Sequence, residues 1–552
     1  MNIPKQGTIE YFEIRRRQLN DVYEQIKPLH KELSEFFSPW TARFELSEID
    51  MKKSAKKIID SIPFECRRNF RSGMMTGITS EADNWFRLSI FGQTDNSDDT
   101  VRKYLWNVEQ LFRGILSASG FYNIQPQIYD DFGVYGLAAY LINENFDTVA
   151  NFIKIPVGSF RYSKNAQNKI DTFVRKYQLT ALDIYKTYGE ENVSENVLKA
   201  IKDKNFNKKI TLIHFVEPNE NYDKKLPWAR NKKYISVIYE LSEKDKILEK
   251  SGYDYMPYVV YEGADNGENN YPVDSCGINA LPDLKQTFSM IKDKMAAIRK
   301  KVKPPLKGPA NIKRRTSEAI SEYYETQTGT EGISTAYEVN IQLNELFQEI
   351  SEHKDTIKKH FFNDLFAMII NVQDKGQRTA FEISELKEEK VTLIAPALGQ
   401  VHQALNDLFD VLFIICDNGH LLPEPPEDIV GKEIKVELVS SLAQAQKAGK
   451  LAGIERYLTL TSNIASTVEP YAKNKVDWFK LLDLYADYGN VPPDIQVSTK
   501  NVLVQKQQEI AQAQKQQEQA QMMQALEQGS KVVDNLGGKD LVANALAERF
   551  GM

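Results

Sequence analysis

Residues 283–302, DLKQTFSMIKDKMAAIRKKV, carry the clearest structural pattern in the chain. Apolar side chains recur there at spacings of four, three, four, three and four residues, at Leu284, Phe288, Ile291, Met295, Ile298 and Val302. This spacing places them along one side of a straight helix. We therefore predict a helix that packs lengthwise against other helices, with Pro282 and Asp283 in its first turn and a basic cluster in its last turn.

Basic residues accompany this apolar seam. Lys285, Lys292 and Arg299 recur every seven residues, so they share one face of the predicted helix. Such a stripe is typical of the solvated flank of a helix that packs on other helices. It would equally suit a surface that faces a polyanion, and both interpretations stay open at this stage.

The segment that follows is strongly basic. Between residues 299 and 315 there are eight Lys or Arg residues and no Asp or Glu, and Pro304, Pro305, Gly308 and Pro309 interrupt the run. Proline and glycine disfavour a helix, so we predict a stiff, positively charged loop that could dock an acidic partner. Beyond Arg299, its bases are Lys300, Lys301, Lys303, Lys307, Lys313, Arg314 and Arg315.

Upstream of the seam the pattern indicates an α+β body. Residues 8–60 are typical of two helices that break near residues 37–40, and residues 71–80 are predicted to form a glycine-punctuated loop. Short β-rich pieces such as 210–216 indicate strands, and helices such as 168–188 are expected between them.

Downstream the chain is predicted to be helical, over residues 339–372 and 379–416. The second of these helices repeats an apolar seam, at Val401, Leu405, Leu408, Leu412 and Ile415. Further on, residues 505–528 contain eleven glutamines. Glutamine is a fair helix former, so this tail is either a long polar helix that packs against copies of itself or a disordered extension.

The composition restricts the function. The chain has 552 residues, and 70 Lys and Arg against 76 Asp and Glu give a net charge of −6. A general nucleic-acid coat normally needs a basic excess, so any contact with nucleic acid must be local. Three cysteines far apart in the sequence favour a reducing compartment. The apolar runs are too short for a membrane span, and the N-terminus lacks the apolar stretch of a signal peptide.

The usual motifs of enzyme chemistry are missing. The sequence has no P-loop, no HExxH zinc motif, no GxSxG nucleophile elbow and no GxGxxG dinucleotide turn. The adjacent acids Asp130 and Asp131 could serve a metal or acid–base site, although a helix cap or turn explains such a pair as well. We therefore predict no catalytic, cofactor-binding or metal-binding residue, and we expect that the protein is not an enzyme.

Several short segments, in order along the chain, resemble those of one protein family. They begin with GMMTGITS at 73–80, WFRL at 85–88 and YDDFGVYGLA at 129–138. They continue with His214 and EPN at 217–219, Pro227-Trp228, Leu281-Pro282-Asp283 and Lys303-Pro304-Pro305, and end with QRTAFE at 377–382, GHLLP at 419–423 and SSLAQAQ at 440–446. Over about residues 10–450 the chain thus resembles the portal, or head-to-tail connector, proteins of short-tailed bacteriophages.

The resemblance implies a mainly α fold with an α+β wing, assembling as a ring of twelve identical subunits. It divides the chain into a wing at 1–280, a first stem helix at 281–303, a clip at 304–338, a second stem helix at 339–372, a tunnel loop at 373–378, a wing return helix and strand at 379–440, and a helical, Gln-rich crown at 441–552. The apolar seam of the first stem helix would pack between subunits.

The resemblance also implies a function and partners. The ring would occupy one capsid vertex of the virion, at the head–tail junction, after assembly in the host cytoplasm, and double-stranded DNA would pass through it during packaging and ejection. Lys285, Lys292 and Arg299 would face this channel. The bases of the clip would dock the large terminase subunit, a separate ATPase, and later tail adaptor proteins. Major capsid and scaffold proteins are further expected partners, and no membrane is expected.

Two other functions stay open from the residues alone. One is a DNA-processing enzyme that uses dispersed carboxylates, and the other is a non-viral helical scaffold that forms no ring.

Overall fold

The computed structural model describes residues 5–40, 44, 58–90, 99–226, 231–243, 246–265, 267, 271–309, 323–326, 334–335, 343–370, 380–439, 441–467, 470–488 and 499–536. Two compact units are distinguished. The first comprises Met1–Arg87, Val108–Leu422 and Val436–Leu458, and the second comprises Leu88–Asn107, Pro423–Lys435 and Thr459–Met552.

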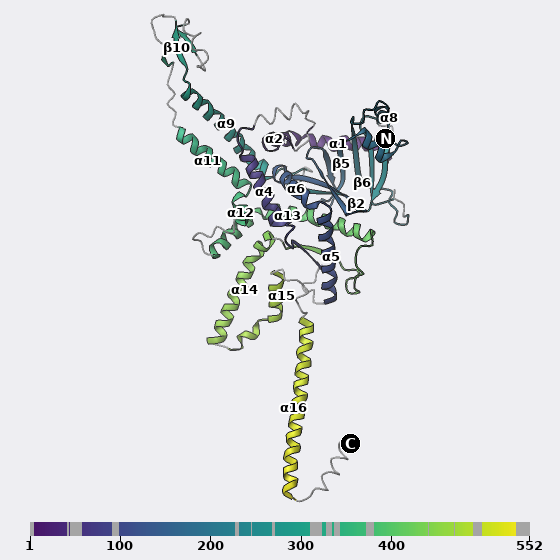
Figure 1. Cartoon of the computed structure of the whole chain (residues 1–552), viewed down its shortest axis with the longest axis vertical. Coiled ribbons are helices and arrows are strands. Elements are labelled where there is room, and N and C mark those ends of the chain that lie inside the picture. The colour runs from purple at the N-terminus through teal and green to yellow at the C-terminus, as the bar shows by residue number, and fades with distance from the viewer. Residues whose placement is uncertain are drawn as a thin grey trace. The chain divides into compact units, whose positions relative to one another are not determined.

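A five-stranded antiparallel sheet forms much of the α+β body in the first unit (Figure 1). Its strands, in spatial order, are β4 (Phe160–Lys164), β5 (Ile170–Thr180), β6 (Lys209–Pro218), β7 (Tyr234–Glu240) and β8 (Ile247–Tyr253). Because side chains alternate along a strand, each face has its own apolar cluster. Helix α1 (Ile9–Glu24) packs on one face, where Phe12 meets Phe215. Helices α7 (Ala181–Tyr188) and α8 (Glu195–Lys202) share a second cluster with Leu212.

A second, three-stranded sheet lies next to the most deeply buried helix. Its order is β3 (Val149–Ile155), β2 (Leu137–Asn145) and β9 (Tyr258–Glu262), and both pairings are antiparallel. Helix α6 (Phe121–Tyr135) leads directly into β2. The reversal takes place at Gly136, whose φ of 66° lies in the left-handed region that favours glycine.

Helices α2 (Lys27–Phe37), α4 (Ile62–Ile78) and α9 (Cys276–Val302) pack against α6. Helix α12 (Asn363–Ile370) packs against α4. The predicted loop at 71–80 is therefore wrong, because residues 71–78 belong to α4. Its glycine at position 73 serves close packing, since a Cβ there would overlap Phe366 of α12.

The seam segment lies in a helical hairpin. Helix α9 (Cys276–Val302) runs antiparallel to α11 (Leu343–His360), and the two lie side by side in Figure 1. Between them the described residues form a small sheet of β10 (Leu306–Pro309) with β11 (Tyr323–Thr326) on one side and β12 (Ser334–Thr335) on the other. Pro309 fits at the end of the central strand because β12 pairs only with Leu306 and Lys307.

Three predictions for this region need correction. Helix α9 begins at Cys276 rather than at Pro282, which lies inside it. The predicted basic loop contains strand β10, whose backbone pairs with two neighbours. The predicted helix at 339–372 is broken between α11 and α12, where Phe362 has a φ of 52° that no α-helix can accommodate.

A further correction concerns residues 168–188, which form strand β5 followed by the short helix α7 rather than one helix. In contrast, the predicted strand at 210–216 is confirmed as part of β6. The mixture of helices and antiparallel sheets agrees with the predicted mainly α fold with an α+β body.

The remaining elements either have residues in both units or belong to one of them. Helix α5 (Asp99–Ala118), strand β1 (Phe86–Ile90), strand β13 (Ile434–Leu438) and helix α14 (Ser441–Thr467) have residues in both units. The 39-residue helix α13 (Ala380–Asn418) lies in the first unit and confirms the helix predicted at 379–416. The second unit also holds the 3₁₀ helix η1 (Pro470–Lys475), α15 (Trp478–Tyr488) and the 38-residue α16 (Thr499–Leu536).

Helix α16 confirms the helical alternative for the Gln-rich segment. Among the residues that the structure describes, no helix is both long and apolar enough to cross a membrane.

Candidate functional site

The base of α9 is fixed to the buried helix α6. Ser275 caps α9, since its Oγ accepts a hydrogen bond from the Ile278 amide at 3.0 Å and donates one to the Val134 carbonyl at 2.9 Å. Gly277 allows the two backbones to approach, because a Cβ at this position would overlap Val134. The hairpin therefore projects from a rigid base.

Three further contacts hold α9 against its own neighbours. The Asp283 carboxylate lies 3.3 Å from His353 Nδ1 and 3.4 Å from His360 Nε2, so one acid of α9 meets two histidines of α11. Further along the hairpin, Lys294 Nζ lies 3.9 Å from the centre of the Phe347 ring. These contacts fix which side of α9 faces α11 within one subunit.

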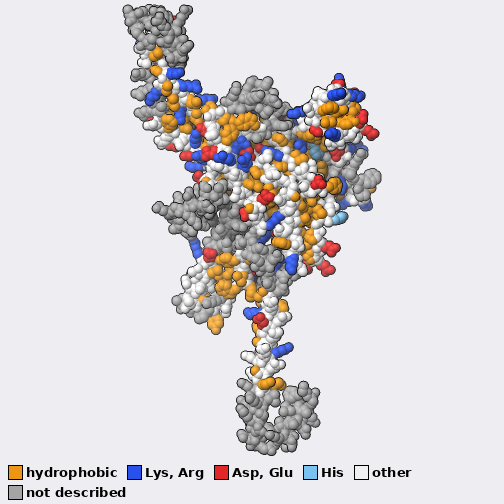
Figure 2. All heavy atoms as spheres, in the orientation of Figure 1, with side chains coloured by type: hydrophobic (Ala, Val, Ile, Leu, Met, Phe, Trp, Pro, Cys, Tyr) orange, Lys and Arg blue, Asp and Glu red, His pale blue; other side chains and the backbone are white. Residues whose placement is uncertain are grey.

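The apolar seam is buried only at its base. Leu284 and Phe288 are buried, and Phe288 packs against Phe36 of α2 with 5.6 Å between ring centres. Toward the far end, Met295, Ile298 and Val302 are 45%, 36% and 72% exposed, and Phe347 of α11 is 44% exposed. Figure 2 shows apolar and basic side chains together over this part of the surface. The far half of the hairpin thus carries apolar surface that the chain itself leaves uncovered.

The second predicted seam behaves differently. Val401, Leu405, Leu408, Leu412 and Ile415 of α13 are all buried within the first unit, next to Phe409, which packs on Trp85 and Phe86. The seam of α13 is therefore part of the internal core of the first unit.

The predicted stripe of bases divides into two parts. Lys285 forms an ion pair with Glu32 of α2 at 2.5 Å, so its charge is already compensated within the chain. Lys292 and Arg299 are exposed, and within the described residues neither has an ion-pair partner.

The basic cluster continues past the end of α9. Lys300, Lys301 and Lys303 are exposed, and Lys307 is half-buried on strand β10. Lys313, Arg314 and Arg315, the other predicted docking residues, lie outside the described residues, as does the predicted tunnel loop at 373–378.

The adjacent acids Asp130 and Asp131 have structural partners. Arg67 forms an ion pair with Asp130 and also donates a hydrogen bond to the Phe37 carbonyl at 2.6 Å. Lys154 pairs with Asp131 at 2.7 Å. Burial raises the pKa of Asp131 to about 6, against the opposing effect of Lys154. These contacts tie α6 to α4 and β3, and the described residues contain no group of three potential ligands that could hold a metal ion.

Buried His214 also has a structural role. Its Nε2 lies 2.9 Å from Ser236 Oγ and its Nδ1 lies 2.5 Å from the Tyr258 hydroxyl, so both ring nitrogens are engaged. Burial lowers the pKa of this histidine to about 3. A neutral, fully hydrogen-bonded imidazole of this kind links the two sheets.

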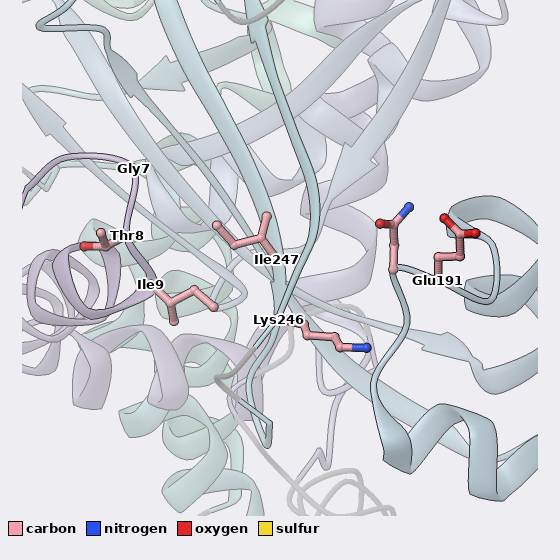
Figure 3. A pocket seen from close by; sticks show the side chains of 7 residues that line it. Gly7, Thr8, Ile9, Glu191, Lys246 and Ile247 are labelled. Carbon is pink, nitrogen blue, oxygen red and sulfur yellow. The ribbon is translucent and has the colours of Figure 1, made fainter.

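One open pocket of about 650 Å³ lies where the start of α1 meets β8 (Figure 3). It is lined by Gly7, Thr8, Ile9, Glu191, Asn192, Lys246 and Ile247. The Thr8 hydroxyl caps α1, accepting from the Tyr11 amide at 3.4 Å and donating to the Lys5 carbonyl at 2.9 Å. Among the described residues that line the pocket, Thr8 carries the only hydroxyl, and that hydroxyl is engaged in the helix cap.

Sequence reasoning missed an acidic stripe on α11. Glu345, Glu349 and Glu352 are exposed, and residues 343–352 contain no Lys or Arg. The spacing of four and three residues was a usable signal, because it puts all three carboxylates on one face of a helix. The pairing of Asp283 with two histidines had no comparable signal, since it depends on the register between two helices.

The family model for the bacteriophage head to tail connecting protein matches residues 12–496. The chain therefore belongs to this family, which confirms the resemblance predicted from the ordered short segments.

Two relatives extend the comparison. The portal protein of Salmonella phage epsilon15 is 29% identical over 488 residues, covering 87% of each chain. The probable portal protein of Bordetella phage BPP-1 is 29% identical over 484 residues, covering 86% of this chain and 87% of the relative. Among solved structures, the virion of a native gene transfer agent particle aligns with a TM-score of 0.33 and 9% identity over 74% of this chain and 87% of that chain.

Proposed function

We propose that this chain is a portal subunit, which forms a ring of twelve copies at one vertex of a phage capsid. The observation that carries the proposal is the similarity to two phage portal proteins over nearly nine-tenths of the chain. The ring is a structural component of the virion at the junction of head and tail, and it is not an enzyme.

The exposed part of the seam supports a role in assembly. A closed ring of identical subunits needs two different, complementary surfaces on each copy. Met295, Ile298 and Val302 offer an apolar strip on a rigid helix, and covering it with a neighbouring subunit would remove this surface from water. Ile291, Leu284 and Phe288 continue the strip toward the buried base.

The channel of the ring is proposed to pass double-stranded DNA during packaging and ejection. Lys285, Lys292 and Arg299 face this channel from one flank of α9. Many strong phosphate contacts would hold the DNA in place, so a chain with a net charge of −6 and a few placed bases suits a conduit.

The end of the hairpin is proposed to be the clip. Its small sheet and the bases Lys300, Lys301, Lys303, Lys307, Lys313, Arg314 and Arg315 would dock the large terminase subunit during packaging and tail adaptor proteins afterwards. Because terminase supplies the ATPase, the portal itself needs no phosphate-binding loop. Oppositely charged surfaces on these partners would accelerate their docking.

The other proposed parts follow the chain. Residues 1–280 and 379–440 form the wing, residues 281–303 and 339–372 the stem, residues 304–338 the clip, residues 373–378 the tunnel loop and residues 441–552 the crown. Scaffold and major capsid proteins would surround the ring as the head assembles in the host cytoplasm, and no membrane takes part.

The two other functions are less well supported. A DNA-processing enzyme needs carboxylates that are free to bind metal or to move protons, whereas Asp130 and Asp131 are paired with Arg67 and Lys154. A non-viral helical scaffold would have no reason to share a family with phage connectors.

Negative-stain imaging of the purified chain tests the proposal. Rings with a central hole are expected, together with loss of rings in Ile298→Asp, because a charge in the apolar strip would have to be desolvated on assembly. Ile14→Asp is the matched control, since Ile14 is an isoleucine on α1 with a similar exposure of 40%. Uniform monomers or dimers of the wild-type chain, also in the presence of scaffold protein, would contradict the proposal.

A further inference from the structure

The two helices of the hairpin carry opposite charges at their far ends. From Lys292 to Lys301, α9 has five basic residues and one acid, Asp293. From Leu343 to Glu352, α11 has three acids and no base. Within the described residues, Glu345, Glu349 and Glu352 form no ion pair, although Gln348 Nε2 donates a hydrogen bond to Glu352 at 3.0 Å.

The two charged stripes cannot meet within one hairpin. Each residue turns a helix by about 100°, so Lys292 and Arg299 lie about 140–160° around α9 from Lys294. By the same rule, Glu345, Glu349 and Glu352 lie about 140–200° around α11 from Phe347. Lys294 and Phe347 are one pair in contact between the two helices, and Asp283 with His353 and His360 is another. Lys292 and Arg299 of α9, and Glu345 and Glu352 of α11, point away from the Lys294–Phe347 contact, so the hairpin has one basic and one acidic edge.

Copies in a ring would bring these edges together. Rotation about an axis nearly parallel to the helices keeps every residue at its own height along that axis. Lys294 of one subunit is therefore level with Phe347 of the next subunit, as it is with Phe347 of its own chain. In this antiparallel register Lys292 lies level with position 349, and Arg299 lies level with position 342. Glu352 and Glu345 are each three residues away from these levels, about 4.5 Å along the axis. Long side chains can span that offset.

We propose that Lys292 and Arg299 of each subunit pair with Glu352 and Glu345 of the next subunit, along one side of the apolar strip of α9. This inference rests on the proposed ring, and it assigns the acidic residues of the next subunit as the partners of the basic stripe on α9. The bases then border the channel at the subunit boundary with their charge compensated by a neighbour, as Glu32 compensates Lys285 within the chain. A wall of compensated bases attracts DNA weakly and lets it slide.

Charge exchange tests the pairing. Lys292→Glu and Glu352→Lys are made singly and together, and the fraction of subunits in rings is measured by sedimentation and negative stain. Each single change places like charges opposite each other, and we expect it to weaken each subunit contact by about tenfold. The double variant restores the attraction and should return to within about twofold of wild type. Lys199→Glu on the exposed face of α8 is the matched control and should leave assembly unchanged.

A cross-link provides an independent measurement. In Arg299→Cys with Glu345→Cys, oxidation should join neighbouring subunits and give a ladder of covalent oligomers that a reductant removes. Far-ultraviolet circular dichroism of each variant establishes that its subunits are folded. Rings of wild type, with a double charge exchange no better than the single ones and no ladder, would overturn the pairing and leave the ring intact. Absence of wild-type rings would overturn the proposed function as well.

Discussion

Close packing at single glycines determines how the helices of the first unit fit together. Gly73 lies on α4 where α12 crosses it, and the side chain of Phe366 occupies the space that a Cβ would need. Gly133 of α6 likewise accommodates Phe70, whose ring atoms would lie 2.7 Å from an added Cβ. These glycines are required for contacts between helices and not for a turn.

A single methyl group at Gly73 should therefore be costly. We expect Gly73→Ala to lower the free energy of unfolding by about 1–3 kcal/mol, because Phe366 or the α12 backbone must shift to accept the new atom. Thermal and denaturant unfolding, compared with wild type, measure the change.

Gly114 offers the matched control. It lies in helix α5 with no atom within 4 Å of an added Cβ. Gly114→Ala should be neutral or should stabilise the chain by up to about 1 kcal/mol, because alanine is the better helix former. Equal effects of the two substitutions would show that helix propensity, rather than packing against Phe366, determines the response.

The glycines also show where sequence reasoning fails at this scale. Residues 71–80 contain two glycines, which favours a loop when only local propensity is considered. Only the position of Phe366, nearly three hundred residues further on, shows that a helix needs glycine here. Asp130 and Asp131 pose the same difficulty, because their partners Arg67 and Lys154 come from distant segments.

Among the elements, helices with a long regular seam were predicted best. The seams of α9 and α13 gave both helices correctly, with the start of α9 misplaced by about two turns because Ser275 rather than Pro282 begins it. In β5, Ile170, Phe173, Val174 and Tyr177 are spaced as on a helix face, yet pairing with β4 and β6 makes the segment a strand. Local pattern could not have revealed those partners.

The sequence pattern also fails to show which surface each apolar seam packs against. The apolar spacing of α9 resembles that of α13, but the far end of α9 is exposed whereas the α13 seam lies in the core. Periodicity identifies a buried face only relative to some partner, and it does not say whether that partner is the same chain or another copy. The candidate site was therefore predictable as a helix with bases on one flank, but its acidic counterpart on α11 was not.

Helix α16 should be stable only in contact with other chains. The described side chains from 503 to 523 are all exposed, including Ile510 at 48% and Met523 at 76%. A helix without tertiary contacts opens readily, so its amides should exchange with solvent quickly in single subunits. In assembled rings we expect slower exchange by at least about tenfold, measured by hydrogen–deuterium exchange with mass spectrometry.

Residues 401–415 of α13, whose seam side chains are buried, provide the internal reference for this measurement. Their amides should be protected equally in single subunits and in rings, because the core of the first unit is complete in one chain. Equal exchange of α16 in both states would mean that it packs on nothing in the ring.

For the whole molecule, family membership was accessible from the sequence because many weak segments occur in one order over most of its length. Assembly is harder to predict from the sequence, because a single chain carries both surfaces of each subunit contact without joining them. The effect of charge is equally hard to predict. The net value of −6 describes the chain, whereas the electrostatic potential in a channel depends on which charges the neighbouring subunits compensate.

Binding of DNA to the assembled ring tests this difference. At about 0.15 M salt we expect isolated wild-type rings to retain double-stranded DNA weakly in filter-binding or gel-shift assays, because Lys292 and Arg299 are paired across subunits. Replacing Glu345, Glu349 and Glu352 together by Gln removes their compensation. The resulting rings should bind DNA more tightly, with a steeper dependence of affinity on salt by about one power of salt concentration for each base released.

A second triple variant separates this local effect from net charge. Glu190, Glu191 and Glu195 are exposed acids around α7 and α8, and changing them to Gln raises the net charge from −6 to −3, as the α11 variant does. DNA binding of this control should stay close to that of wild type, since attraction between exposed charges is largely screened beyond about 10 Å. If both variants gained affinity for DNA equally, net charge would govern DNA passage. A gain in DNA affinity confined to the α11 variant would show that the paired edges of the hairpin govern it.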